Sequence, residues 1–138
     1  MPDQRGKPMQ DSIVAGAVVY AKDLKRVSHF YAELAAWPVV EDEPGHVVLQ
    51  SPAFQLVVVA VPPAIAARIA IASPPARRED TAIKLCFPVA SLAAARSAAA
   101  RLGGGLLGPE REWEFQGSFV CDGHDPEGNV IQVRAGSR

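Results

Sequence analysis

Few residues of this chain could do chemistry, and most of them lie in or beside short alternating runs. In the stretch HDPEGNVIQV, Ile131 and Val133 share one face of an expected strand and Gln132 lies on the other. Gln132 offers a neutral amide, which can orient a ligand as both donor and acceptor of hydrogen bonds. The structural alternative is that Gln55 or backbone across the sheet satisfies this amide.

The histidines offer one local cluster. His124 stands near Asp122 and Asp125 in the sequence, so it is the best candidate for a metal ligand in a turn. The alternative is that such a cluster only caps backbone and meets solvent. His29, within an expected helix, and His46, after a Pro-Gly turn, are expected to be surface or packing residues.

The two cysteines do not indicate nucleophilic or redox chemistry. Cys86 and Cys121 lie in strand-like runs, not in a CxxC pair, and are expected to be reduced, buried thiols of a cytoplasmic protein. No histidine lies in a strand beside either one. No serine lies in a nucleophile-elbow motif, and the glycines 103–105 follow an expected helix, so they form no phosphate-binding loop.

Composition excludes two classes of partner. The 138 residues carry a formal charge of −1, from 14 Lys and Arg against 15 Asp and Glu, with no basic stripe, so nucleic-acid binding is not expected. No apolar run reaches the roughly 18 residues that would span a membrane. Residues 1–12 lack an apolar core and are expected to be a loose tail, not a signal peptide.

Two stretches that begin 68 positions apart follow one plan. GAVVYAKDLKRVSHFYAEL, from residue 16, and KLCFPVASLAAARSAAARL, from residue 84, each indicate a strand, a polar residue and a helix. Asp23 and Ser91 stand at the same offset, where each can cap the helix that follows. Further strands follow each helix, with turns at Pro44-Gly45 and DPEGN. The sequence therefore predicts a βαβββ unit written twice.

Neither half is long enough to close its own core, so we expect one α+β domain over residues 13–138. Module one covers 13–61, a connector rich in proline covers 62–80, and module two covers 81–135. Within the connector, the segment ARIAIA (67–72) favours a short strand over a helical turn.

The layout resembles the vicinal oxygen chelate superfamily of glyoxalases, bleomycin-resistance proteins and extradiol dioxygenases. Three segments carry the resemblance: KDL to FYAEL at 22–34, its weaker echo at 84–102, and DPEGNVIQV at 125–133. The resemblance implies that the modules curl into a half-open barrel, with helices on the convex side and a ligand cavity on the concave side. It also implies a homodimer.

The resemblance implies four metal ligands, usually His or Glu, two from each module. The matching positions hold Gly16, Gln55, Lys84 and Gln132, and none of these is a usual ligand. An ammonium group about 4 Å from a dication, at an effective dielectric near 20, is repelled by about 8 kcal/mol. We therefore expect no metal and no cofactor.

Alternation assigns the residues to two faces. The apolar set expected beneath the helices is Ala17, Val19, Ala21, Leu85, Phe87, Val89, Ile131 and Val133. The residues expected to bind a ligand are Val18, Tyr20, Gln55, Val57, Lys84, Cys86, Trp113, Phe115, Gln132 and Arg134. Trp113 and Phe115 could instead fill core. Lys84 is expected among Val18, Val57 and Cys86, where its ammonium could await an anionic ligand, pair with a protein carboxylate or reach solvent. The acidic groups at 41–43 and at Glu110, Glu112 and Glu114 are expected to be solvated.

The leading hypothesis is a metal-free protein that binds a small organic molecule, with Lys84 favouring an anionic one. One alternative is a metal-dependent lyase, isomerase or dioxygenase with atypical ligands. Another enzyme reading has Lys84 polarise a carbonyl or stabilise an enolate in place of the metal. The last alternative is an interaction module whose cavity is filled by side chains.

Overall fold

The computed structural model describes residues 13–138, so the expected tail, residues 1–12, lies outside the described residues. Module one contains β1 (Ala15–Ala21), α1 (Leu24–Ala35), β2 (Val39–Glu43), β3 (His46–Gln50) and β4 (Phe54–Ala60). The connector contains the short helix α2 (Pro63–Ala66). Module two contains β5 (Leu85–Pro88), α3 (Leu92–Arg101), β6 (Gly105–Leu106), a 3-10 turn (Pro109–Arg111), β7 (Trp113–Phe115), β8 (Ser118–His124) and β9 (Val130–Ala135).

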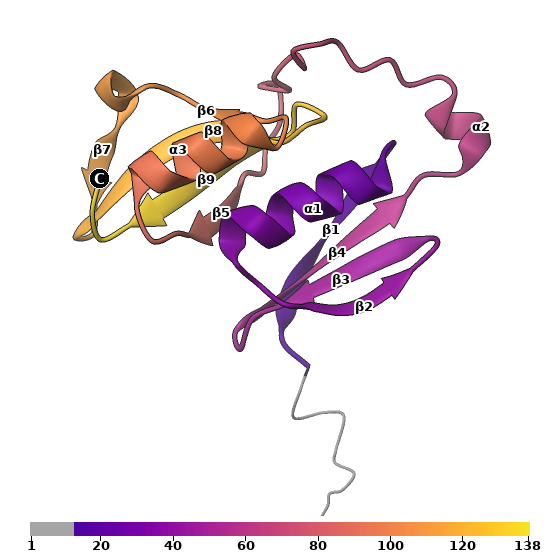
Figure 1. Ribbon diagram of the computed structural model, residues 1–138, viewed down its shortest axis with the longest axis horizontal. Helices are drawn as coiled ribbons and strands as arrows, with labels where there is room; N and C mark the ends of the chain where they lie inside the picture. The colour runs from indigo at the N-terminus through magenta and orange to yellow at the C-terminus, as the bar shows by residue number, and fades with distance from the viewer. Residues whose placement is uncertain (1–12) are drawn as a thin grey trace, which may run out of the picture.

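Each module forms its own sheet. The first has the strand order β1-β4-β3-β2, and the second has β5-β9-β8-β6, with β7 also paired to β8. In both sheets the first strand lies parallel to the last one, and the other pairings are antiparallel. The sheets lie side by side, with α1 and α3 on the same face of the pair (Figure 1). The predicted α+β fold with a doubled βαβββ plan is confirmed, and neither sheet closes into a barrel.

The helix starts follow the predicted caps. The side chain of Asp23 accepts a hydrogen bond from the backbone amide of Arg26 at 3.2 Å. The hydroxyl of Ser91 accepts one from the amide of Ala94 at 3.0 Å. Because each cap satisfies an amide that has no partner inside its helix, it fixes the residue at which the helix begins.

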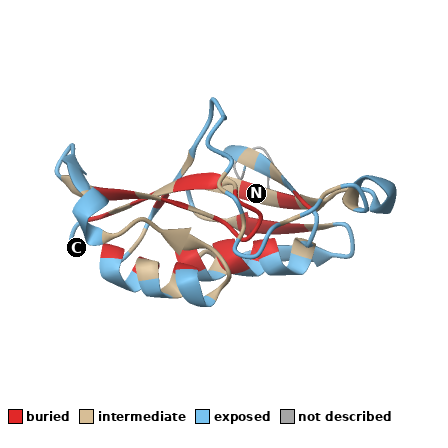
Figure 2. Ribbon diagram, turned by 90° about the horizontal axis from the view of Figure 1, so that it is seen from above, coloured by how far each residue is buried: buried red, intermediate tan, exposed pale blue. Residues whose placement is uncertain are grey.

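One core lies between the helix layer and the two sheets (Figure 2). All eight residues predicted beneath the helices lie in this core or pack against it. The two modules share the core, because the Phe87 ring of β5 lies 5.3 Å from that of Tyr31 and 5.5 Å from that of Trp37. The predicted apolar face is therefore confirmed, and we call the opposite face, which the resemblance implies is concave, the concave face.

The turn between β8 and β9 is held by a buried carboxylate. Asp125 accepts hydrogen bonds from the amides of Glu127 at 2.8 Å and Asn129 at 3.0 Å, as expected for a turn-forming Asp. Gly128 has a φ of 86°, a left-handed conformation that glycine adopts without strain.

The same turn docks onto α1 of the other module. The carboxylate of Glu127 accepts hydrogen bonds from the backbone amides of Lys22 at 2.9 Å and Asp23 at 2.7 Å. The hydroxyl of Tyr31 donates to Asp125 at 2.7 Å. The most specific family segment thus links the two modules.

The expected strand at 67–72 is wrong. The backbone here satisfies its hydrogen bonds locally, because the amides of Ala67, Arg68 and Ile69 donate to carbonyls three or four residues earlier. Backbone groups that make such turn hydrogen bonds are not available for pairing with a strand. No helix within residues 13–138 has the length and apolar character needed to cross a membrane.

Candidate functional site

The four positions matched to metal ligands lie on, or directly before, the first and last strands of the modules. Gly16 on β1 lies opposite Gln55 on β4, which supports the register assumed for Gln55. Gln132 on β9 lies opposite Cys86 on β5, and Lys84 directly precedes β5.

A row of polar contacts runs along the concave face of module two. Lys84 Nζ donates to Asp122 Oδ2 at 2.8 Å, and Gln132 Nε2 donates to Asp122 Oδ1 at 3.2 Å. Arg134 Nε donates to Gln132 Oε1 at 2.9 Å, and its guanidinium lies 4.9 Å from the centre of the Phe115 ring. We call these five residues the concave row.

The surroundings of Lys84 differ from the leading expectation. Its ammonium is paired with Asp122, and the two side chains are 39% and 19% exposed. A small hollow of about 230 Å³ beside them is lined by connector residues such as Arg77 and Glu79. The expected apolar neighbours Val18 and Val57 belong to the other sheet and do not line it. The internal ion pair, one of the three alternatives, is the one that forms.

Sequence reasoning considered Asp122 only beside His124 and missed its place beside Lys84 and Gln132. The strand β8 continues past Cys121 to His124. This extension brings Asp122 opposite Gln132 in the β8–β9 ladder. The signal that could have found it is the alternation of polar residues through Asp122 and His124.

The concave face of module one is less polar. Gln55 Nε2 donates to Gln50 Oε1 at 2.9 Å, so its amide is satisfied within its own sheet. Val18 and Tyr20 are 54% and 67% exposed. Within residues 13–138, no hydrogen bond joins Gln55 to Gln132.

A cavity of about 690 Å³ lies between β1 and the chain segment that leads into β5. Val18, Tyr20, Ile83 and Leu85 give it apolar walls, and Arg78, Asp80, Thr81 and Asn129 give it polar groups. Of the ten residues predicted to bind a ligand, Val18 and Tyr20 line this cavity and Lys84 lines the neighbouring hollow. The other seven line neither of these spaces.

The residues at the family metal positions do not fit a cation. Gly16 has no side chain, the ammonium of Lys84 is bound to Asp122, and the Gln132 amide turns its NH₂ group toward that same carboxylate. Among the described residues, no group of three or more His, Cys, Asp or Glu side chains could hold a metal ion. We therefore derive no step through a metal.

His124 lies beside the connector without a ligand-like cluster. Its Nε2 atom is buried and has no hydrogen-bond partner among the described residues. Burial, and then the Arg77 guanidinium nearby, lower the pKa of His124 below its ordinary value. A neutral imidazole is thus favoured here.

Cys86 lies otherwise than expected, and Trp113 and Phe115 do not take the core-filling alternative. Cys86 is exposed, so only Cys121 is a buried thiol, and both are free. Partial desolvation by the surrounding protein still raises the pKa of the Cys86 thiol, although Arg134 opposes this shift. Trp113 and Phe115 on β7 are exposed and fill no core. A short strand paired only to β8 leaves one side of each ring open to solvent.

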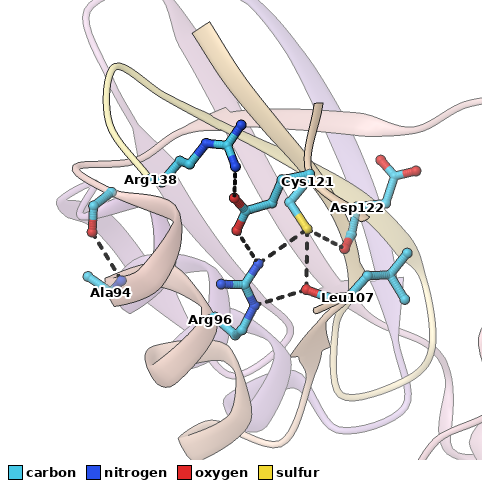
Figure 3. A network of polar contacts seen from close by, with 8 residues as sticks. Ala94, Arg96, Leu107, Cys121, Asp122 and Arg138 are labelled. Atoms are coloured by element: carbon cyan, nitrogen blue, oxygen red, sulfur yellow. Dashed lines mark hydrogen bonds and ion pairs between the residues drawn. The ribbon is translucent and has the colours of Figure 1, made fainter. Parts of the chain in front are cut away.

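A polar network joins Arg96, Leu107 and Cys121 in module two (Figure 3), and Glu112 belongs to it through its contacts with Arg96 and Arg138. The Glu112 side chain is 3% exposed and lies 2.7 Å from Arg96 Nη2, with Arg138 at 3.7 Å. Arg96 Nε donates to the Leu107 carbonyl at 2.9 Å, and Cys121 Sγ donates to the same oxygen at 3.3 Å. The expectation of a solvated Glu112 is therefore wrong, because α3 places an arginine against it.

Residues 16–134 match the model of the glyoxalase-like domain family. No curated protein matches the sequence. A glyoxalase/bleomycin resistance protein/dioxygenase family enzyme from Burkholderia phytofirmans PsJN has a similar structure, with 16% identity and a TM-score of 0.62 over 88% of this chain and 96% of that one.

Two other solved structures are similar at comparable coverage. A lactoylglutathione lyase from Agrobacterium tumefaciens is 21% identical, with a TM-score of 0.54 over 91% of this chain and 94% of that one. A bleomycin resistance determinant encoded on the transposon Tn5 is 19% identical, with a TM-score of 0.52 over 89% and 97%. At these identities the likeness is one of fold.

Proposed function

The chain belongs to the glyoxalase-like domain family, and from this premise we propose that it binds a small organic molecule on its concave face without a metal ion. The observation that carries the proposal is the concave row. Lys84 and Gln132 stand at positions where the resembled superfamily would hold a cation. Here both side chains donate hydrogen bonds to Asp122. A neutral amide and a paired ammonium orient a ligand by hydrogen bonds, and they attract no cation.

The cavity between β1 and β5 supports the same proposal. Its volume of about 690 Å³ is in the range of small-molecule sites. Apolar Val18 and Ile83 with a few polar groups such as Thr81 give it the mixed lining typical of such sites. The other predicted residues, Gln55, Val57 and Cys86 among them, would contact a ligand that extends over the open face.

The test is a screen of neutral and charged fragments, followed by backbone amide shifts of the ¹⁵N-labelled protein. We expect hits that shift amides of β1, β5 and β9. Val18→Asp should abolish them, because it puts a charge into the apolar wall. Val40→Asp is the matched control, since Val40 is a strand valine exposed to a similar degree, 57% against 54%. Hits that map only to the helix layer, or no hits, would contradict the proposal.

Metal content separates this proposal from the enzyme with atypical ligands. Protein purified without chelator should carry well under one equivalent of Zn, Fe, Mn or Ni, and EDTA should leave its melting temperature unchanged. One tightly held equivalent, lost together with stability on chelation, would favour the metal-dependent lyase, isomerase or dioxygenase.

A further inference from the structure

The charges of the concave row do not cancel, and one positive charge remains. Lys84 and Asp122 neutralise each other at 2.8 Å, and Gln132 is neutral. Arg134 then contributes a guanidinium that contacts a neutral amide oxygen and an aromatic ring. No carboxylate within residues 13–138 pairs with it.

The geometry leaves the outer edge of this guanidinium free. Its Nε donates to Gln132 at 2.9 Å, and its Cζ lies over the Phe115 ring, 4.9 Å from the ring centre. The two terminal nitrogens have no hydrogen-bond partner in the described part of the chain. A guanidinium held at Nε and placed over an aromatic ring presents its remaining N–H groups in a planar fork that matches a carboxylate.

The surroundings suit a ligand with an apolar body. Phe115 is exposed on β7, and the exposed Cys86 lies opposite Gln132, beside Arg134 on the same face. Arg134 itself is only partly exposed, so a bound anion would be partly shielded from water. Such shielding strengthens a charge-assisted hydrogen bond.

We propose that Arg134 binds the carboxylate of a small organic acid, whose apolar part lies along Phe115 and Cys86. The inference rests on the proposed function and names its ligand class. Arg134 thereby takes the anion-binding role that was expected of Lys84, because the charge of Lys84 is compensated by Asp122.

The probe is sodium benzoate, compared with benzamide, which has nearly the same shape but no charge. In titrations of the ¹⁵N-labelled full chain, benzoate should shift amides around Arg134 and bind about tenfold or more tightly than benzamide. Arg134→Gln should remove this preference and leave benzamide binding unchanged. Arg134→Lys keeps the charge without the planar fork and should retain part of it. Arg101→Gln, which removes an exposed arginine at the end of α3, should change nothing.

Equal binding of benzoate by the parent and by Arg134→Gln would overturn the inference, as would equal binding of benzoate and benzamide by the parent. If neutral fragments still map to the concave face in that case, the proposed function stands and only the role of Arg134 fails. If no compound of the screen binds this face, the proposed function and the inference fail together.

Discussion

Lys84 and Asp122 form a partly exposed ion pair, and this changes the expected sign of a substitution. An unpaired, buried ammonium would destabilise the empty protein, so its removal would be stabilising. The observed pair lies at 2.8 Å with Lys84 39% exposed. An ion pair this exposed to solvent contributes little to the free energy of unfolding, but its contribution is stabilising.

Lys84→Met should therefore lower the free energy of unfolding by about 0.5 kcal/mol, because Asp122 loses its cation but keeps the Gln132 amide. Urea unfolding at neutral pH measures the change. Lys25→Met, at an exposed position on α1, is the control and should have no clear effect. A clear gain in stability for Lys84→Met would contradict the pairing.

His124 should make the stability depend on pH. Burial and Arg77 lower its pKa in the folded protein, so the unfolded chain takes up the proton first as the pH falls. The contribution of the neutral imidazole is complete above about pH 6.5 and is lost as the pH falls through the folded-state pKa. His124→Gln should flatten this part of the stability curve in urea unfolding from pH 7.5 to 5, about the range that histidine titrates. His29→Gln, on the exposed face of α1, should leave the slope as it is in the parent.

At the scale of elements, the turn between β8 and β9 binds the start of α1. Glu127 is 5% exposed, and its carboxylate accepts two backbone hydrogen bonds at the start of α1. A negative group at a helix N-terminus also meets the positive end of the helix dipole.

Glu127→Gln should lower the free energy of unfolding by about 2 kcal/mol, because one carboxylate oxygen becomes an NH₂ group that cannot accept from an amide. Glu33→Gln changes the same charge on the exposed side of α1 and should cost far less. Urea unfolding of both variants checks this. Similar losses for the two would mean that Glu127 does not dock α1.

Elements with strong local signals could be predicted from the sequence, and those that depend on distant contacts could not. The caps at Asp23 and Ser91 and the turn at Asp125 are local, since each side chain bonds backbone within four residues. The segment 67–72 has apolar alternation but makes turn bonds with the preceding residues, which outweigh its β-propensity.

The same distinction between local and distant contacts holds for the candidate site. Alternation placed Gln132 and Arg134 on the concave face, and the ladder agrees. The partner of Lys84 lies 38 residues away on β8, so no spacing in the sequence could reveal it. Glu112 stands in an acidic run that indicates a solvated face, but its carboxylate is buried against Arg96, which comes from α3.

At the scale of the whole molecule, the concave face is open within one chain. Val18, Tyr20 and Ile83 are among the most exposed apolar residues of the described chain, and all three line the cavity between β1 and β5. The concave groups of the two modules, such as Gln55 and Gln132, find their partners within their own sheets. A second copy of the chain would cover these apolar residues and the open sheet edges.

We therefore expect a homodimer, with a mass by light scattering of twice the 14.6 kDa of one chain. Tyr20→Asp should weaken it about tenfold or more, because a charge would have to be buried against the partner. Ile65→Asp, at an exposed position on α2, should leave the mass unchanged. A monomer at every concentration would contradict the dimer. An equally stable dimer for Tyr20→Asp would show instead that another face, such as the free edge of β2, joins the copies.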